Sequence, residues 1–313
     1  MSRRTVLIDA PSNLGLRAPA PGAVPGCHKL AGALRDAGTA RRLGAVEGGV
    51  VVPPPYGTGA WRPGDGVFHA AELAAYAEGL AARLQPHIRG GDFPVVLGGD
   101  CSIALGTCLA LRRTGRYGLA YVDGHDDFRH PGNAPAHRIG AAGGEAVALV
   151  TGRGQPDLAD LDGLGPYIRD ADLVLLGLRD AWDEPENAQR ELTGLGIAYS
   201  TVATVRERGP DAVARGALKR LEDSGLDGFW LHMDADVLDP GVLPAVDSTE
   251  PGGLGAEEVR ELLRPLAASP RCAGLTLTVY DPDREPGTVL PGAPLPGAGL
   301  LAGLLEEVLE GCP

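Results

Sequence analysis

The chain has 313 residues, 44% of them hydrophobic and 4% aromatic, with 28 basic against 41 acidic residues and a formal net charge of −13. This length permits one large α/β domain or two ordinary domains. The negative charge argues against nucleic acid and anionic membranes as partners and favours small polar or cationic ligands. The five cysteines form no CxxC pair, which favours a reducing cytoplasm, and no segment approaches the length of a membrane span.

Short β-branched or leucine-rich segments alternate with amphipathic segments, a pattern typical of a mostly parallel sheet wrapped by helices. In chain order, we predict strands at 5–8, 49–52, 94–97, 118–122, 173–176, 229–233 and 274–279. We predict helices at 71–84, 103–113, 211–224, 256–268 and 300–309, and proline- and glycine-rich loops at 52–57 and 281–299. Because no long linker divides the chain, we expect one domain over residues 1–313.

Two acidic clusters, each directly after an apolar segment, give the strongest functional signal. They read Asp-Gly-His-Asp-Asp at 123–127 and His-Met-Asp-Ala-Asp at 232–236. Alternate residues of an extended segment share a face, so each cluster is expected to present three donors on one side. Crowded acids repel each other unless a cation is present. Either cluster alone is also consistent with a solvated junction between strand and loop, but the two together favour a metal site.

A third segment, Gly-Gly-Asp-Cys-Ser at 98–102, joins a predicted strand to a predicted helix. By itself it is consistent with a tight turn in which Asp100 or Ser102 caps the helix and Cys101 is a small buried residue.

Together the three segments resemble the ureohydrolase superfamily of arginases, agmatinases and formiminoglutamases. Its members read Gly-Gly-Asp-His-Ser, Asp-Ala-His-x-Asp and Ser-x-Asp-x-Asp-x-x-Asp-Pro in this order. The segments 9–11, 176–180 and 250–254 match as well, so the resemblance covers nearly the whole chain. It implies a three-layer α/β/α sandwich around a central, mostly parallel sheet, with two manganese ions at the carboxyl ends of the strands.

The resemblance also implies a ligand set and a reaction. Two close cations would hold a shared water as hydroxide, the nucleophile, and Asp127 would orient it and pass its proton to the leaving nitrogen. By analogy we expect a homo-oligomer, a trimer or hexamer. The implied ligands are Asp123 and Asp234 between the ions, His125 and Asp236 on one ion, and Asp127 and Cys101 on the other.

The chain departs from the family pattern at three places. Cys101 stands where the family usually has histidine, so zinc, iron or a single ion becomes an alternative to two manganese ions. Val279 stands where guanidine-cleaving members carry the glutamate that grips the guanidinium. Residues 143–146 align with a His-Gly-Met-Pro segment and lack its histidine.

Other side chains are candidates for catalysis or substrate binding. His232 stands where the family commonly has serine, and we predict a general acid or a residue that orients a ligand; a histidine merely hydrogen-bonded at a strand end is the alternative. His130 and His137 lie in the segment that forms part of the substrate wall in relatives; an exposed loop histidine is the alternative for each. Asp183 is a candidate for binding an ammonium or amide group, with an ordinary loop carboxylate as the alternative. Glu145 or Glu250 would be the substitute acid if the chain cleaved guanidines.

The leading hypothesis is a metal-dependent hydrolase of a non-peptide C–N bond in an amidine, formimino, ureido or amide group. A degenerate family member that binds metal or ligand without turnover is the second hypothesis. A true arginase or agmatinase is the third.

Overall fold

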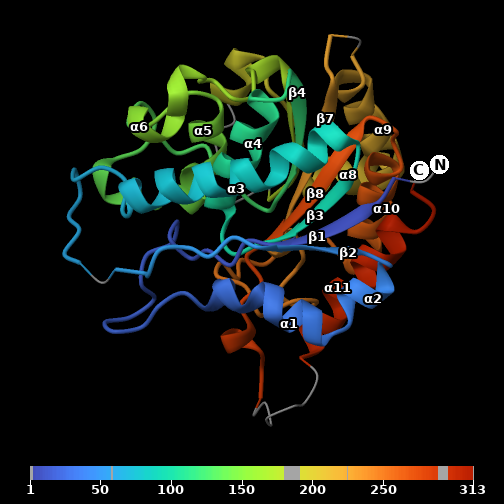
Figure 1. Cartoon of the computed structure of the whole chain (residues 1–313), viewed down its shortest axis with the longest axis horizontal. Helices are drawn as coiled ribbons and strands as arrows, with labels where there is room; N and C mark the ends of the chain where they lie inside the picture. Colours follow the sequence, from blue (N-terminus) through green and yellow to red (C-terminus); the bar gives the residue numbers. More distant parts are fainter. Residues whose placement is uncertain (1–2, 58, 180–190, 224, 288–294, 313) are drawn as a thin grey trace.

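The computed structural model describes residues 3–57, 59–179, 191–223, 225–287 and 295–312. Within these ranges eight strands, all paired in parallel, form one sheet in the order β2-β1-β3-β8-β7-β4-β5-β6 (Figure 1). The strands are β1 (Thr5–Asp9), β2 (Val46–Val50), β3 (Phe93–Leu97), β4 (Tyr117–Val122), β5 (Leu173–Leu178), β6 (Ala198–Thr201), β7 (Gly228–Asp234) and β8 (Cys272–Thr278).

Helices cover both faces of the sheet. Figure 1 shows α3 to α6 together on one face, with α1, α2 and α11 on the other, and packing contacts extend the second layer through α10, α9 and α8. The helices are α1 (Leu30–Asp36), α2 (Thr39–Arg42), α3 (Ala70–Gly90), α4 (Ala104–Arg112), α5 (Ala146–Val150), α6 (Pro156–Ala159), α8 (Val202–Arg208), α9 (Pro210–Leu221), α10 (Ala256–Ala267) and α11 (Pro296–Leu309). The predicted three-layer α/β/α sandwich is confirmed.

The seven predicted strands and five predicted helices all form, with errors at their ends, but the helices α1, α2, α5, α6 and α8 and one strand were not predicted. The strand predicted at 49–52 lies at Val46–Val50, and α11 begins at Pro296, inside the predicted loop 281–299. The sequence analysis missed β6, a four-residue edge strand whose side chains are all partly exposed. Because β6 is short and only half-buried, it lacks the continuous apolar run that marks the central strands.

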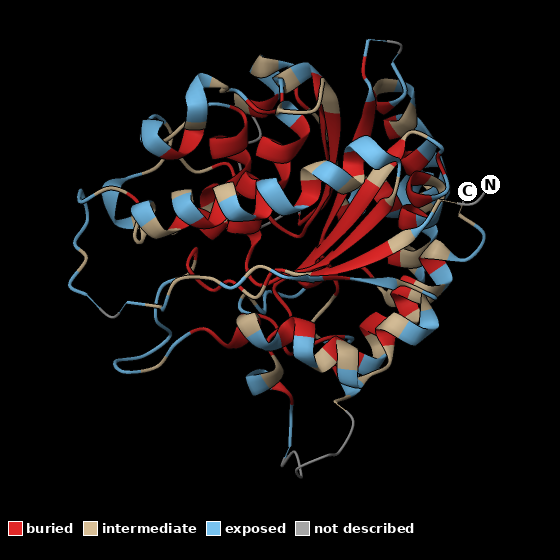
Figure 2. Ribbon diagram, viewed as in Figure 1, coloured by how far each residue is buried: buried red, intermediate tan, exposed pale blue. Residues whose placement is uncertain are grey.

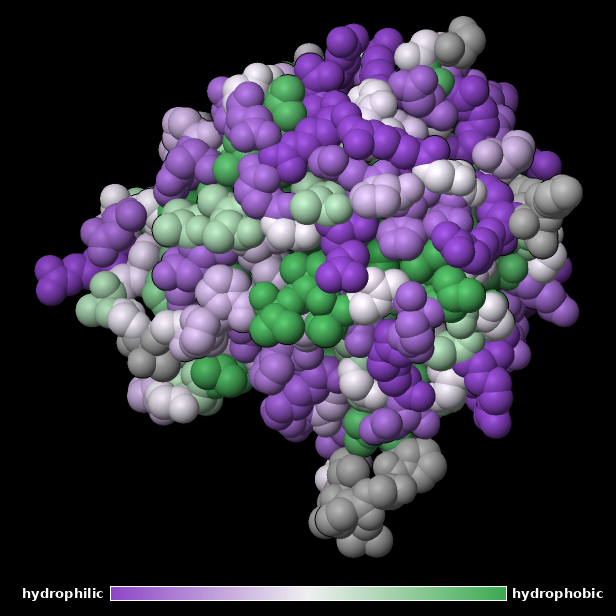
Figure 3. Space-filling model, viewed as in Figure 1, coloured by the Kyte–Doolittle hydropathy of each residue, from purple (hydrophilic) through white to green (hydrophobic). Residues whose placement is uncertain are grey.

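The sheet forms the centre of the hydrophobic core, and every residue of β3, β5 and β7 is buried (Figure 2). Hydrophilic residues dominate the face shown in Figure 3, with hydrophobic residues in limited areas. The strand β2 at the sheet edge exposes Val46 and Val50. No helix in the described ranges is long and apolar enough to cross a bilayer.

The strand order determines where a site can form. The neighbouring strands β3, β8, β7 and β4 occupy the middle of the sheet. Because all four run parallel, the segments that follow them meet at one edge, which is where open α/β sheets bind ligands.

Candidate metal centre

The segment after β4 forms a tight turn. The strand ends at Val122, the backbone amide of His125 donates to Asp123 Oδ1 at 2.6 Å, and Asp127 has a positive φ of 44°. The expectation of an extended ladder at 123–127 is therefore wrong. The turn, in which an aspartate accepts from a backbone amide two residues ahead, brings these side chains together instead.

The second cluster is extended only in its first half. His232 and Asp234 belong to β7 and share one face of the strand, whereas Asp236 lies in a single 3-10 turn at Ala235–Val237. Asp234 begins this turn by accepting a hydrogen bond from the Asp236 backbone amide at 2.7 Å. The strand thus positions two of the three predicted donors, and the turn positions the third.

The segment after β3 approaches the loop around Ser12 closely. A Cβ atom at Gly99 would collide with the backbone carbonyl of Ser12, so only glycine fits. Asp100 caps the following 3-10 turn by accepting from the Ser102 amide at 2.8 Å, and it also accepts from the Gly15 amide at 3.1 Å. The Asp100 carboxylate therefore accepts hydrogen bonds from the backbone and does not line the pocket. Cys101, the next residue, lines the pocket beside the acids.

The three segments bring the predicted ligands together. The Cys101 Sγ atom lies 2.7 Å from Asp234 Oδ2, and His125 Nδ1 lies 3.0 Å from Asp236 Oδ2 and 3.5 Å from Asp123 Oδ1. Donor atoms within 4.8 Å of one another form two groups that share Asp123. The groups are Cys101, Asp123 and Asp127, and Asp123, His125 and Asp236.

Burial and mutual repulsion govern the ionisation of this cluster. Burial, with the charge of Asp236 adding to it, raises the pKa of Asp123 to about 7, and burial together with neighbouring acids raises the pKa of Asp127 and of Asp234 well above the usual range. Burial and the adjacent carboxylates also raise the pKa of the Cys101 thiol. A bound cation would relieve this repulsion, because it favours the charged form of every donor.

The residues present fit a site for divalent cations. The four aspartates Asp123, Asp127, Asp234 and Asp236 are at most 7% exposed. Asp236 Oδ1 accepts no hydrogen bond from the described residues, although Arg179 Nη1 lies 3.7 Å from it. Buried carboxylate oxygens without hydrogen bonds are costly, and carboxylate and imidazole donors are typical ligands of manganese.

Arg179, which the sequence analysis did not single out, supports the second cluster. Its guanidinium is buried and donates to the backbone carbonyls of Asp236 at 2.6 Å and Glu250 at 3.0 Å. A Cβ atom at Gly124 would collide with it, so glycine there leaves room for Arg179. The available signal was the segment 176–180, which resembles the family and contains this arginine.

His232 lies behind Cys101 and is 1% exposed. Its Nε2 atom lies 3.6 Å from Cys101 Sγ and 3.2 Å from Thr278 Oγ1, and its ring stacks on that of Tyr121 with centroids 4.3 Å apart. The stacking follows from the register, because His232 pairs with Tyr121 across β7 and β4. Burial lowers the pKa of His232 to about 3, so the imidazole is neutral.

Val279 follows β8 and lines the same pocket. It has a positive φ of 73°, and the Tyr280 amide donates to the Thr278 carbonyl across it at 3.0 Å, which makes a classic γ-turn. This conformation is rare and strained for a β-branched residue. The pocket thus has an apolar side chain at the position where guanidine-cleaving relatives have glutamate.

The other residues predicted to bind substrate do not lie together at the donor cluster. His137 lines the pocket, whereas His130 bonds to Glu191 at 3.0 Å, and Asp183 lies outside the described residues. Glu250 Oε2 lies 3.5 Å from His125 Nε2, a contact that lowers the pKa of Glu250 to about 2. Glu145 is buried behind the wall of the pocket, where its Oε1 atom accepts from the Gly140 amide.

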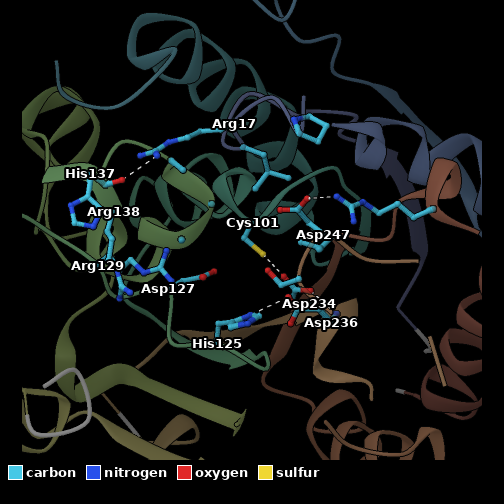
Figure 4. A pocket seen from close by; sticks show the side chains of 18 residues that line it. Arg17, Cys101, His125, Asp127, Arg129, His137, Arg138, Asp234, Asp236 and Asp247 are labelled. Carbon is cyan, nitrogen blue, oxygen red and sulfur yellow. Dashed lines mark hydrogen bonds and ion pairs between the residues drawn. The ribbon is translucent and has the colours of Figure 1, made fainter. Parts of the chain in front are cut away.

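The pocket above the cluster has a volume of about 490 Å³, which suits a small metabolite. Cys101, His125, Asp127, Asp234 and Asp236 form its floor (Figure 4).

Comparisons with known proteins identify the family. The model of the Arginase family matches residues 20–295, so this chain belongs to that family. The chain is 33% identical to an arginase of Bacillus caldovelox over 196 residues, which are 62% of this chain and 63% of the relative. The solved structure of Bacillus caldovelox arginase is similar over 98% of both chains, with a TM-score of 0.84 and 25% identity. Formimidoylglutamase of Bacillus subtilis shares the fold, with a TM-score of 0.74 and 20% identity over 99% of this chain and 88% of the other.

Proposed function

We propose that this chain is a metal-dependent hydrolase that cleaves a non-peptide C–N bond in an amidine, formimino, ureido or amide group. The observation that carries the proposal is the pair of buried donor groups that share Asp123, whose other members line the floor of the pocket. We expect two manganese ions, with zinc or iron as the alternative because of Cys101. Divalent ions bound there supply the Lewis acidity that lowers the pKa of a water to near neutrality.

The residues of this chain have separate roles in the proposal. Cys101, Asp127, His125, Asp236, Asp123 and Asp234 would hold the ions, with Asp123 shared by the two donor groups. The Tyr121 hydroxyl donates to Asp127 Oδ2 at 2.6 Å, which fixes that carboxylate at the pocket floor. In this proposal Asp127 takes a proton from the attacking water and delivers it to the leaving nitrogen.

We assign His232 a positioning role in place of a general-acid role. Its imidazole is neutral, buried, and in contact with Cys101, Thr278 and Tyr121. It orients two side chains that reach the cluster, the thiol of Cys101 and the ring of Tyr121.

Val279 narrows the proposed substrate class. A guanidinium group needs a carboxylate partner at position 279 of the pocket, and valine supplies none. Amidine, formimino, ureido and amide compounds are therefore favoured over arginine and agmatine.

The test is release of ammonia or amine from one compound of each class, with manganese-loaded wild type beside Asp234→Ala. Turnover in the wild type that Asp234→Ala loses supports the proposal. Metal binding without turnover of any class would favour the non-catalytic binding protein. Faster turnover of guanidines than of the other classes would favour the arginase or agmatinase hypothesis.

A further inference from the structure

A second pocket lies at one edge of the sheet, between the strands β5 and β6 and the helices α8 and α9. We call it the edge pocket. Val174 and Leu176 of β5 form its buried, apolar side, and Arg208 of α8 and Arg220 of α9 also line it. Its volume is about 270 Å³, and it shares no lining residue with the pocket above the donor cluster.

Small side chains on β6 leave space beside the larger residues of β5. The register pairs Val174 with Ala198 and Leu176 with Ser200, and all four residues line the edge pocket. Because alternate residues of a strand share a face, these two pairs lie on the same face of the sheet. Alanine and serine at the edge strand therefore leave part of this face uncovered.

The helix α9 does not fill this space. Val213, Gly216 and Ala217 line the pocket at spacings of three and four residues, so they lie on one face of the helix. Glycine is unfavourable inside a helix, and packing does not require it at position 216. A Cβ atom there would meet a single neighbour within 4 Å, Arg208 Nη2 at 3.9 Å. Gly216 thus keeps the pocket open, with the Arg208 guanidinium beside it.

Two arginines and no carboxylate line the edge pocket. Arg220 is held in place by its Nη1 atom, which donates to the carbonyls of Gly196 at 2.9 Å and Ala171 at 3.3 Å. Arg208 lies in the last turn of α8 and makes no hydrogen bond or ion pair with the residues that the structure describes. Its neighbour Glu207 does not line the pocket.

Nearby acids are already paired with other arginines. Asp170 and Asp172 lie on either side of Ala171 in the sequence. Arg153 pairs with the first at 2.8 Å, and Arg116 pairs with the second at 2.8 Å. In a chain with a net charge of −13, a pocket lined by two guanidinium groups and no acid therefore favours an anion.

We infer that the edge pocket is a second ligand site, which binds a small organic anion with an apolar body. The carboxylate or phosphate group of this ligand pairs with Arg208 and Arg220 through charge-assisted hydrogen bonds, and its apolar body packs against Val174 and Leu176. The volume lies below the roughly 300–1,000 Å³ of pockets that hold drug-sized ligands, so the ligand is small. The inference does not depend on the proposed reaction, because the two pockets share no residue.

Calorimetry of the full chain with benzoate and with benzamide, its neutral counterpart, tests the inference. We expect benzoate to bind at least about fivefold tighter than benzamide. Arg208→Gln should weaken benzoate at least about fivefold and leave benzamide unchanged. Gly216→Leu should weaken both probes, because the leucine side chain occupies the pocket, while the melting temperature is maintained. The matched control Arg215→Gln removes an exposed arginine of α9 that does not line the edge pocket, and it should leave both affinities unchanged.

Phenylphosphonate distinguishes the two kinds of anion. Tighter binding of phenylphosphonate than of benzoate, lost in Arg208→Gln, supports a phosphate ligand, and the reverse order supports a carboxylate. Benzoate affinity that Arg208→Gln and Gly216→Leu both leave unchanged would locate the binding elsewhere and overturn the inference. The absence of saturable binding of either anion up to about 20 mM would overturn it as well.

Discussion

Cys101 and His232 are neighbours in the structure, and this chain has its histidine at position 232 where the family usually has it at position 101. The family usually has histidine at the first position and commonly serine at the second, whereas this chain has cysteine and histidine, and the two side chains lie 3.6 Å apart. We therefore predict that Cys101→His and His232→Ser are each harmful alone and compensate in the double variant.

The structure gives the size of each effect. In Cys101→His the larger ring must displace Asp234, Thr278 or His232, each within 3.6 Å of the present thiol, and such overpacking costs about 1–3 kcal/mol. In His232→Ser a cavity opens beside Tyr121, at a cost of roughly 2–4 kcal/mol. In the double variant the new ring at position 101 fills that cavity, so we expect a favourable coupling of about 1–3 kcal/mol.

Urea unfolding of the four proteins without metal measures this coupling, and elemental analysis after manganese loading measures metal preference. The double variant should lose less free energy of unfolding than the two single variants lose together. It should also retain manganese at least as well as the wild type. Strictly additive losses of stability would refute the exchange.

Three further predictions follow from the site. Val279→Glu should raise kcat/KM for 4-guanidinobutyrate at least about tenfold relative to a formimino compound, an effect that Val279→Gln should not reproduce. Arg179→Lys should lower the free energy of unfolding by about 2–4 kcal/mol, because an ammonium group cannot replace the guanidinium on two carbonyls; a loss below about 0.5 kcal/mol would contradict this. Asp123 and Glu145 have folded pKa values of about 7, above their ordinary values, so their contribution to stability is full below about pH 4 and is lost as the pH rises toward 7. The melting temperature of metal-free protein should therefore decrease as the pH is raised from 5 to 8. Manganese competes with protons for the carboxylates, so it should raise the melting temperature more at pH 8 than at pH 5.

The sequence predicted the sheet well because its central strands are continuous apolar runs. The run at 173–176 needs burial on both faces, and β5 has it at every residue. β6 was not predicted because its residues are partly exposed and form no continuous apolar run. The true start of α11 was not predicted because it lies in a segment rich in proline and glycine.

The ligand cluster was predictable in composition but not in geometry. Aspartates spaced by two residues occur equally in an extended ladder and in a turn where the aspartate side chain accepts from the backbone, and the sequence does not distinguish them. In the structure, residues 123–127 form the turn.

Long-range contacts explain what the sequence analysis missed. Arg179 and Arg17 acquire their contacts only when distant segments meet. Arg17 reaches the carbonyl of His137, which is 120 positions away in the chain, and no local pattern reports such a contact. The roles of the individual site residues and the predicted homo-oligomer stay predictions.

Manganese content tests the central claim most directly. Protein loaded with manganese and then desalted would be analysed for the wild type, for Asp123→Ala, which removes the shared donor, and for the matched control Asp247→Ala, which removes a carboxylate of the same pocket outside the donor groups. The account predicts close to two ions per chain in the wild type and the control, and loss of both in Asp123→Ala. No manganese, zinc or iron in the wild type after loading with each would contradict a metal-dependent hydrolase.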